Sequence, residues 1–262
     1  MSQPVTRFNR AIVRRPAASV VDGLRAIDVG APDFAAVIGE HDAYCAALND
    51  AGVTVDVLEA LPEFPDSVFV EDPAMVFTEG AILLKPGAAS REGETKMIAD
   101  DIRSRFDTVL NLGDGYAEGG DVLVTPGAVL IGLSARTDEA GAQSLIDCLA
   151  KLGKKGQIFQ TPEGVLHFKT DCSLVDEETV LATSRLAGSD AFKSMRVLQT
   201  PDGEEAAANA LRVNDVVFVG SDFPRTIDML TDAGYDVVPL PTTEIGKVDA
   251  GLSCMSLRWW AE

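Results

Sequence analysis

The chain has 262 residues, with 22 lysines and arginines against 41 aspartates and glutamates, so its formal net charge is −19. Apolar residues make up 46 % of the chain and charged residues 24 %, an ordinary composition for a globular protein with a sizeable core. The charge excludes general binding to nucleic acid, because phosphates would be repelled and no basic stripe is visible. An acidic chain suits a cationic ligand, although acidity alone is more often a solubility feature.

Cysteine usage and hydropathy indicate the compartment. The four cysteines (Cys45, Cys148, Cys172 and Cys254) form no C-x-x-C pair and are too few and too scattered for a disulfide scaffold or a structural zinc site. The N-terminus has no apolar segment of signal-peptide length, and no apolar run approaches a membrane span. We therefore expect a cytoplasmic protein without membrane contact.

Five segments with helical spacing each lead into a short β-like run. In chain order the helical segments are 33–51, 91–106, 137–152, 187–195 and 224–233, and the runs after them are VTVDVL, TVLNL, QIFQ, RVLQ and YDVVPL. Gly52, Gly153 and Gly234 follow three of these segments, as glycines often do at helix ends. The segment 187–195 has the weakest helical pattern.

Two further β-like stretches, joined by a turn, separate each run from the next helix. AMVFT–EG–AILLKP is the clearest hairpin pattern, and VLVTPGAVLIGL, CSLVDEETVLAT and DVVFVG repeat it. The last unit stops after LSCMSLRWW, whereas RFNRAIVRRP at the N-terminus is a strand without a preceding partner. A last unit completed by the first strand is typical of a closed ring, in which no sheet edge is exposed.

The sequence therefore predicts an α/β fold: a five-bladed ring of ββαβ units with pseudo-fivefold symmetry, in a single domain spanning residues 1–262. No Gly/Ser-rich or Pro-rich linker divides the chain. The alternative, a doubly wound α/β sheet, requires single strands between helices, whereas two or three strands separate the helices here.

Each unit has a polar residue just ahead of its first hairpin strand. These residues are Glu71 and Asp72, then Glu118, His167, Asn209 and Cys254, and they recur every 42 to 49 residues. In a ring such equivalent positions converge on the axis. A thiol, an imidazole and several carboxylates would then meet in one pocket, as covalent catalysis requires.

Simpler roles fit the other histidine and cysteines. His41 falls on the polar side of its helix, where we expect it to be solvated, and Cys45 and Cys148 are expected to be small buried apolar side chains. His167 is expected in a strand, pointing away from its neighbours Leu166 and Phe168. No histidine or cysteine pair has the spacing typical of a metal site, so no metal is expected.

The acidic segment FPDSVFVEDP (64–73) points to a cationic ligand. Asp66, Glu71 and Asp72 bracket the apolar residues 68–70, so at least one carboxylate lies near apolar surroundings. Several ionised carboxylates together are costly unless a cation compensates them. A guanidinium fits this role because its planar array of donors matches carboxylates.

Six segments, in order, resemble the dimethylarginine dimethylaminohydrolases, guanidino-modifying enzymes with the pentein fold. They are FPDSVFVEDP (64–73), REGET (91–95), EGGD (118–121), SART (134–137), LHFKT (166–170) and DAGLSCMSLR (249–258). The resemblance runs from about Arg14 to Arg258, nearly the whole chain. The fold of this family is a five-bladed ring of ββαβ units, in agreement with the repeat pattern.

The resemblance implies a role for each matching residue. Cys254 would be the nucleophile, His167 the general acid and base, and Glu118 the acid that orients His167 and binds the guanidinium. The implied substrate contacts are Glu71 and Asp72 at the guanidinium, Asp66 at the amino-acid end, Arg91 and Arg136 at the α-carboxylate, Leu24 in a lid loop, and Val248 near the α-amino group.

The implied reaction is hydrolysis of Nω-methylated arginine to citrulline and dimethylamine or methylamine, with no cofactor. The nearest alternative is an arginine deiminase or another guanidino hydrolase with the same catalytic residues; arginine deiminases are longer and carry an inserted helical domain, for which this chain has no room. A more remote alternative is a non-catalytic pentein binding protein, which predicts a basic surface and no Cys–His–Glu set. The Trp259–Trp260 tail is a candidate contact in a homodimer.

Overall fold

The computed structural model describes residues 3–162 and 164–262. Its α-helices are α1 (Phe34–Asp50), α2 (Glu94–Arg103), α3 (Glu139–Lys151) and α4 (Pro224–Asp232). Its strands are β1 (Arg10–Arg14), β2 (Thr54–Leu58), β3 (Ala74–Phe77), β4 (Gly80–Leu83), β5 (Val109–Asn111), β6 (Val122–Val124), β7 (Val129–Leu133), β8 (Gly156–Gln160), β9 (Cys172–Leu174), β10 (Thr179–Ala182), β11 (Arg196–Gln199), β12 (Leu211–Val213), β13 (Val216–Gly220), β14 (Asp236–Leu240) and β15 (Leu257–Trp259).

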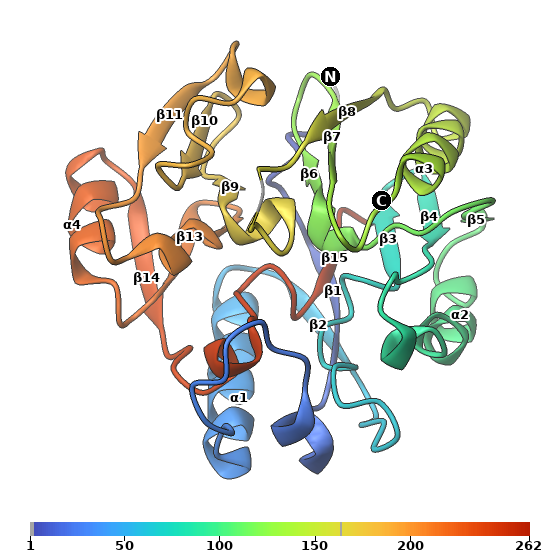
Figure 1. Ribbon diagram of the computed structural model, residues 1–262, viewed down its shortest axis with the longest axis horizontal. Coiled ribbons are helices and arrows are strands. Elements are labelled where there is room, and N and C mark those ends of the chain that lie inside the picture. The colour runs from blue at the N-terminus through green and yellow to red at the C-terminus, as the bar shows by residue number, and fades with distance from the viewer. Residues whose placement is uncertain (1–2, 163) are drawn as a thin grey trace.

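The strands form five sheets of three strands with the same connectivity. In the sheet β3-β4-β5, for example, β3 runs antiparallel to β4 with Met75 opposite Ile82, and β4 runs parallel to β5 with Ile82 opposite Leu110. Where a unit has an α-helix, the helix lies between the second and third strands, as a parallel crossover requires. Figure 1 shows the sheets around the middle of the molecule, with the α-helices on the outside.

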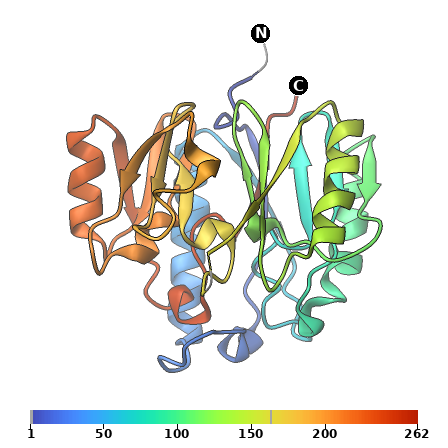
Figure 2. The ribbon, with the colours of Figure 1, turned by 45° about the horizontal axis from the view of Figure 1, so that its top comes forward.

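One sheet joins the two ends of the chain. The C-terminal strand β15 pairs antiparallel with β1, placing Arg258 opposite Ala11, and β1 pairs parallel with β2. The predicted pairing of the first strand with the last unit is confirmed. Both termini emerge at one end of the molecule in Figure 2, and the short helical turns at 18–22 and 245–248 lie at the other end.

Capping side chains and glycines set the helix ends. Asp33 accepts a hydrogen bond from Ala36 N at the start of α1, and Asp138 accepts one from Gly141 N at the start of α3. The glycines after α1, α3 and α4 have φ of +86°, +72° and +93°, values that other residues rarely adopt.

The expectation of a helix at 187–195 is wrong. The segment contains only a 3₁₀ turn at Asp190–Phe192. Gly188 and Ser189 are poor helix formers, and the Ser189 side chain accepts from Ala191 N and so caps a short turn instead. Only Ala191 and Phe192 of this turn are buried, too little apolar surface to hold a longer helix.

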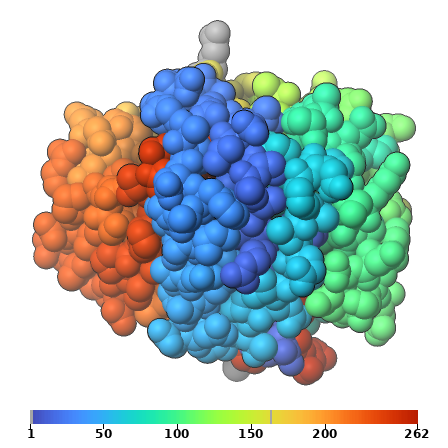
Figure 3. Space-filling model, turned by 90° about the horizontal axis from the view of Figure 1, so that it is seen from below, coloured from blue at the N-terminus to red at the C-terminus, as the bar shows by residue number. Residues whose placement is uncertain are grey.

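The largest core cluster draws on both ends of the chain, including Ala11, Val13, Leu252 and Met255. Figure 3 shows the N-terminal part of the chain that includes α1, in blue, on the surface between the orange C-terminal segment and the green segment near residue 100. Trp259 is buried, with its ring centroid 5.0 Å from that of Phe106. It therefore belongs to the core, and of the Trp259–Trp260 pair only Trp260 is partly exposed.

His41 is buried, contrary to the expectation of a solvated side chain, with 3 % of its surface exposed. The spacing of Val37, His41, Tyr44 and Leu48 explains the error, because residues four and three apart share one face of a helix. His41 therefore occupies the apolar stripe of α1. Across the described residues, no helix is long and apolar enough to cross a membrane.

Candidate active site

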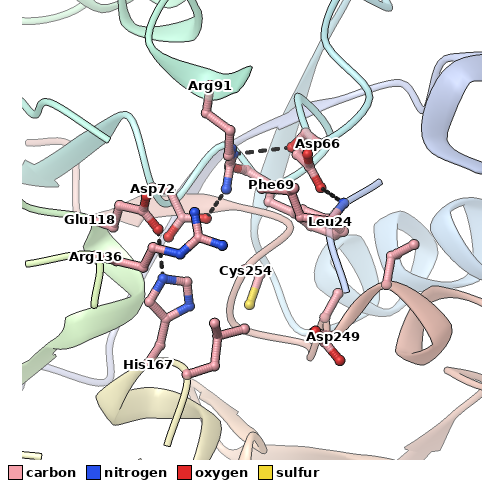
Figure 4. Close-up of a pocket in the computed structure, with 13 residues that line it drawn as sticks. Leu24, Asp66, Phe69, Asp72, Arg91, Glu118, Arg136, His167, Asp249 and Cys254 are labelled. Carbon is pink, nitrogen blue, oxygen red and sulfur yellow. Dashed lines mark hydrogen bonds and ion pairs between the residues drawn. The ribbon is translucent and has the colours of Figure 1, made fainter. Parts of the chain in front are cut away.

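One cavity brings together nine of the ten residues expected at the site. They are Leu24, Asp66, Asp72, Arg91, Glu118, Arg136, His167, Val248 and Cys254. These residues come from segments spread over the chain, and their side chains converge in Figure 4. Four further residues line the cavity without having been expected there: Phe69, Leu166, Asp249 and Ala250. All four stand inside the motifs that carry the family resemblance, and their places in those motifs were the available signal.

His167 and Glu118 form the central hydrogen bond of the pocket. His167 Nε2 lies 2.6 Å from Glu118 Oε2. The other carboxylate oxygen, Oε1, accepts hydrogen bonds from Gly87 N at 2.9 Å and Ala88 N at 3.2 Å, so the carboxylate is held at both ends. Burial opposes a charge on the His167 ring, but the Glu118 hydrogen bond and the nearby Asp72 and Asp121 outweigh it and raise its pKa to about 9. The ring is therefore an imidazolium at neutral pH.

Asp121 ties together three of the motifs that carry the resemblance. Its Oδ2 accepts from Ser134 Oγ at 2.7 Å and Thr137 Oγ1 at 2.6 Å, and its Oδ1 accepts from Phe168 N at 2.9 Å. Asp121 is completely buried, and burial raises its pKa. Its bonds connect EGGD, SART and LHFKT and fix the position of His167.

Two glycines let the backbone approach the site closely. A Cβ on Gly119 would lie 2.0 Å from the Glu71 carbonyl oxygen, and one on Gly120 would lie 2.8 Å from the His167 ring. The EGGD sequence is therefore a packing requirement around His167. His167 itself stands in a bend ahead of a 3₁₀ turn at Phe168–Thr170, not in the expected strand, and Leu166 lines the same cavity as His167 instead of pointing away from it.

Cys254 lies in the turn that precedes β15. Its backbone is fixed on both sides, because Cys254 N donates to Gly251 O at 3.3 Å and Glu71 N donates to Cys254 O at 3.3 Å. Burial, reinforced by the charges of Glu71 and Asp72, raises the pKa of the Cys254 thiol to about 11. The resting site therefore pairs a neutral thiol with a charged imidazole.

Arg91 is fully engaged by the protein. Its guanidinium pairs with Asp72, bonds both oxygens of Glu94 at 3.0 and 2.7 Å, and donates to the carbonyls of Asp66 at 3.1 Å and Phe69 at 3.0 Å. Burial would raise the pKa of Asp72, but Arg91 and His167 outweigh it and lower that pKa. Burial raises the pKa of Glu94 to about 7 despite Arg91. Arg91 thus shapes the acidic segment 66–72.

Arg136 is placed differently from Arg91. Its side chain is half-buried, and its guanidinium projects into the cavity between Glu118 and Cys254 in Figure 4. The SART turn fixes its backbone, because Arg136 N donates a hydrogen bond to Ser134 Oγ at 2.9 Å. An arginine that faces the open cavity is free to meet an anionic group of a ligand.

The segment after Gly23 is held over the cavity by two carboxylates. Leu24 N donates to Asp66 Oδ1 at 2.9 Å, and Ala26 N donates to Asp249. Asp249 has a φ of +56° and directly follows the buried Val248. Leu24, in contrast, is 37 % exposed. The expected lid residue therefore lies at the mouth of the cavity.

Glu71 is the one expected residue that does not line this cavity. Its carboxylate instead pairs with Lys169, accepts from Ser253 Oγ at 3.2 Å and lies 3.5 Å from an Arg258 nitrogen. These groups face a second cavity, of about 980 Å³, on the side of the chain termini. A substrate contact by Glu71 remains a prediction, and sequence reasoning missed its partner Lys169 although that residue stands in LHFKT.

Asp72, Glu118 and His167 could hold a metal ion by geometry alone, since one ligand atom of each lies within 4.8 Å of the others. Each of the three already has protein partners. Asp72 pairs with Arg91 and accepts a hydrogen bond from Gly120 N, and Glu118 and His167 are hydrogen-bonded to each other. An acid–base arrangement accounts for the three groups, and we assign no metal to them.

Known proteins are similar to this chain in both sequence and fold. The arginine deiminase family model matches residues 59–217. The N(G),N(G)-dimethylarginine dimethylaminohydrolase of Pseudomonas aeruginosa is 37 % identical over 254 residues, covering 96 % of this chain and 100 % of that protein. The enzyme of the same name from Streptomyces coelicolor is 29 % identical, covering 95 % of this chain and 96 % of its own. A solved structure of the Pseudomonas aeruginosa enzyme with citrulline matches with a TM-score of 0.93 at 36 % identity, over 96 % of this chain and 99 % of that one.

The matching fold and the convergence of cysteine, histidine and carboxylates define a guanidino-modifying enzyme. Within that class the identity of 37 % over nearly the full length decides the branch. The chain belongs to the dimethylarginine dimethylaminohydrolase family.

Proposed function

We propose that this protein hydrolyses Nω-methylated arginine to citrulline and dimethylamine or methylamine. The observation that carries the proposal is the pocket itself, in which the Cys254 thiol, the His167–Glu118 pair and Asp72 share one cavity. Carboxylates suit the guanidinium, and Arg136 suits the α-carboxylate of a free amino acid. Leu24, Asp66 and Val248 would enclose the amino-acid end.

Substrate binding activates the nucleophile in this proposal. A thiol with a pKa of about 11 is almost entirely protonated at neutral pH. The substrate guanidinium is a cation placed beside Cys254, where it offsets the charges of Glu71 and Asp72 that disfavour the thiolate. The thiol releases its proton to solvent as the cation enters, so the reactive thiolate forms mainly when a substrate is present.

The first half of the reaction releases the amine. The Cys254 thiolate attacks the guanidinium carbon and forms a neutral tetrahedral adduct with a new C–S bond. The His167 imidazolium donates its proton to the methylated nitrogen, and the C–N bond breaks to release dimethylamine or methylamine. An S-alkylthiouronium remains on Cys254, and His167 is left neutral. General acid help of this kind contributes about 10²–10⁴-fold to a rate.

The second half hydrolyses the intermediate. Neutral His167 takes a proton from water, which attacks the thiouronium carbon. The C–S bond then breaks with the Cys254 thiolate as the leaving group, and the new hydroxyl group loses its proton to solvent, which gives citrulline. Glu118 keeps the ring oriented and stabilises its charged form in both halves. His167 and solvent account for every proton transfer, so the proposed chemistry uses no metal or organic cofactor.

We further propose a single domain over residues 1–262 that forms the five-bladed ring of the pentein fold, acting in the cytoplasm. The five sheets of identical connectivity and the pairing of β15 with β1 support the ring. The four cysteines are all free, which supports a reducing compartment. We also propose a homodimer. Of the Trp259–Trp260 pair that suggests this contact, Trp260 is the partly exposed residue.

An amine-release assay tests the function directly. The protein is given arginine, monomethylarginine and asymmetric dimethylarginine separately, and ammonia, methylamine and dimethylamine are each measured together with citrulline. We expect the highest kcat/KM with a methylated substrate. A higher kcat/KM for citrulline formation from arginine would make the protein an arginine deiminase in function, the activity named by the family model that matches residues 59–217.

A further inference from the structure

The five units carry equivalent residues at one position, and one of these five residues has no part in the mechanism above. The residues just ahead of the first hairpin strands are Asp72, Glu118, His167, Asn209 and Cys254, which precede β3, β6, β9, β12 and β15. Four of them line the catalytic cavity. The fifth, Asn209, follows a 3₁₀ turn at Glu205–Ala208 and is half-buried. Its side chain meets the nucleophile from outside that cavity.

The Asn209 amide bridges the turn that carries Cys254. Its oxygen Oδ1 accepts a hydrogen bond from Ser253 N at 3.1 Å, and its nitrogen Nδ2 lies 3.7 Å from Cys254 Sγ. Because Ser253 N–H can only donate, the amide oxygen must face Ser253, and the amide nitrogen must then face the sulfur. The donor direction toward Sγ follows from this.

Gly251 keeps the amide in this place. A Cβ on Gly251 would lie 2.1 Å from Asn209 Cγ and 2.5 Å from Nδ2. Asn209 N donates to Ala206 O at 3.3 Å, and its neighbours Ala208 and Ala210 are buried. The amide is therefore packed between its own turn and the Cys254 turn, with little freedom to rotate away from the sulfur.

A donor at this position favours the thiolate. Hydrogen bonds to the charged form of a group lower its pKa, whereas Glu71 and Asp72 raise that of Cys254. We propose that Asn209 is a catalytic residue, which donates its Nδ2–H to the Cys254 thiolate and to the same sulfur when it leaves in the second half of the reaction. The proposal rests on Cys254 being the nucleophile of the proposed function.

The test compares variants whose other charges are unchanged. On the cavity side Cys254 faces Asp72, Glu118, Arg136, His167 and Asp249, with Asp66 and Arg91 lining the cavity as well. On the other side lie Glu71, Lys169 and Arg258. None of these is altered in Asn209→Ala, which deletes the donor, or in Asn209→Asp, which keeps the shape and replaces the donor with a negative acceptor. Asn49→Ala is the matched control, because Asn49 is an exposed asparagine that donates to Cys45 O.

The measurement is the rate of alkylation of Cys254 by iodoacetamide from pH 6 to 10, read by peptide mass spectrometry with the Cys45 peptide as an internal reference. We expect the rate at pH 7 to fall about 3- to 10-fold in Asn209→Ala, as one lost hydrogen bond implies, and further in Asn209→Asp. The profile should move to higher pH in both variants, and Asn49→Ala should match the unaltered protein.

A profile for Asn209→Ala that superimposes on that of the unaltered protein overturns the proposal, even if turnover falls, because it would reduce Asn209 to support of the turn. Should Asn209→Ala fail to fold, the isosteric Asn209→Asp decides alone: an unshifted profile overturns the proposal. Alkylation is independent of which amine the enzyme releases, so this outcome is distinct from a failure of the proposed function.

Discussion

The chain contains two histidines, and the surroundings of the two are opposite in character. On α1, His41 Nδ1 lies 3.8 Å from the thiol of Cys45, so sequence-local geometry places a histidine and a cysteine side by side. In the catalytic cavity, the His167 ring bonds Glu118, and Cys254 comes from a segment 87 residues further along the chain. Proximity alone would single out the pair on α1.

The pKa values distinguish the two histidine–cysteine pairs. The thiol pKa values do not separate the pairs, since burial is the main cause that raises the pKa of both Cys45 and Cys254 to about 11. The histidines differ: burial lowers the pKa of His41, whereas Glu118, Asp72 and Asp121 overcome burial and raise that of His167 to about 9. A charged imidazole and an acid-lined cavity for a cation, not a close thiol, distinguish the candidate active site.

Replacing the two cysteines gives the largest contrast. Cys254→Ser should lower turnover at least about 10³-fold, because a hydroxyl is a far weaker nucleophile toward a resonance-stabilised guanidinium. Cys45→Ser should keep turnover within about twofold. Steady-state citrulline formation by both purified variants checks this, with circular dichroism to confirm folding. Full activity in Cys254→Ser would refute the covalent mechanism.

Replacing the two histidines should give almost as large a difference in kcat. His167→Asn removes the group that donates and accepts the proton, and should lower kcat about 10²–10⁴-fold. His41→Gln should leave kcat and KM near their original values, because His41 lies on the core-facing stripe of α1. Comparable losses of kcat in both variants would mean that the two environments do not differ as described.

The pH dependence of activity should follow the charge on His167. The amine leaves only if His167 is protonated, so kcat/KM should fall as pH rises through about 9. Glu118→Gln removes an anion that raises this pKa, so the alkaline limb should move to lower pH, by on the order of one unit. A pH–rate profile of each protein measures the shift. An unmoved limb would show that Glu118 does not set the His167 pKa.

The smallest effect concerns stability, and its sign differs between the two histidines. The pKa of His41 is lowered in the folded state, so its contribution is present above its unfolded value, near 6.5, and is lost as pH falls through the lowered pKa. The pKa of His167 is raised, so its contribution is full below about 6.5 and is lost as pH rises to about 9. Urea unfolding at pH 5, 7 and 9 should therefore show less acid destabilisation in His41→Gln and less alkaline destabilisation in His167→Asn.

Much of the fold could be predicted because the repeat is written in local patterns. Alternating apolar hairpins and helix-terminal glycines placed the strands and three of the helix ends, and the unpartnered first strand predicted its pairing with the last unit. The prediction of a helix at 187–195 was wrong because a weak apolar pattern with Gly188 and Ser189 buries too little surface to offset the free-energy cost of helix nucleation. The burial of His41 was missed although its spacing from Val37 and Tyr44 was already in the sequence.

The sequence predicted which residues belong to the candidate site better than it predicted which way their side chains face. Equivalent positions in the units identified Cys254, His167 and Glu118, and the structure brings them into one cavity. Which way a carboxylate faces depends on partners distant in sequence: Glu71 turns toward Lys169, and Arg91 is saturated by Glu94 and Asp72. Local patterns carry no information on such pairings. Asn209 fitted the repeat, but its sequence position suggested no chemical role; the structure shows its amide nitrogen 3.7 Å from Cys254 Sγ.

The most direct test of the covalent mechanism is the site at which the intermediate forms. The protein is mixed with asymmetric dimethylarginine, quenched with acid during turnover, digested and analysed by mass spectrometry, with His167→Asn as a second sample. The proposed mechanism predicts an adduct equal to the substrate minus dimethylamine on the Cys254 peptide, with the Cys45 peptide unmodified. An adduct on Cys45, or turnover with no adduct on Cys254 in either protein, would contradict it.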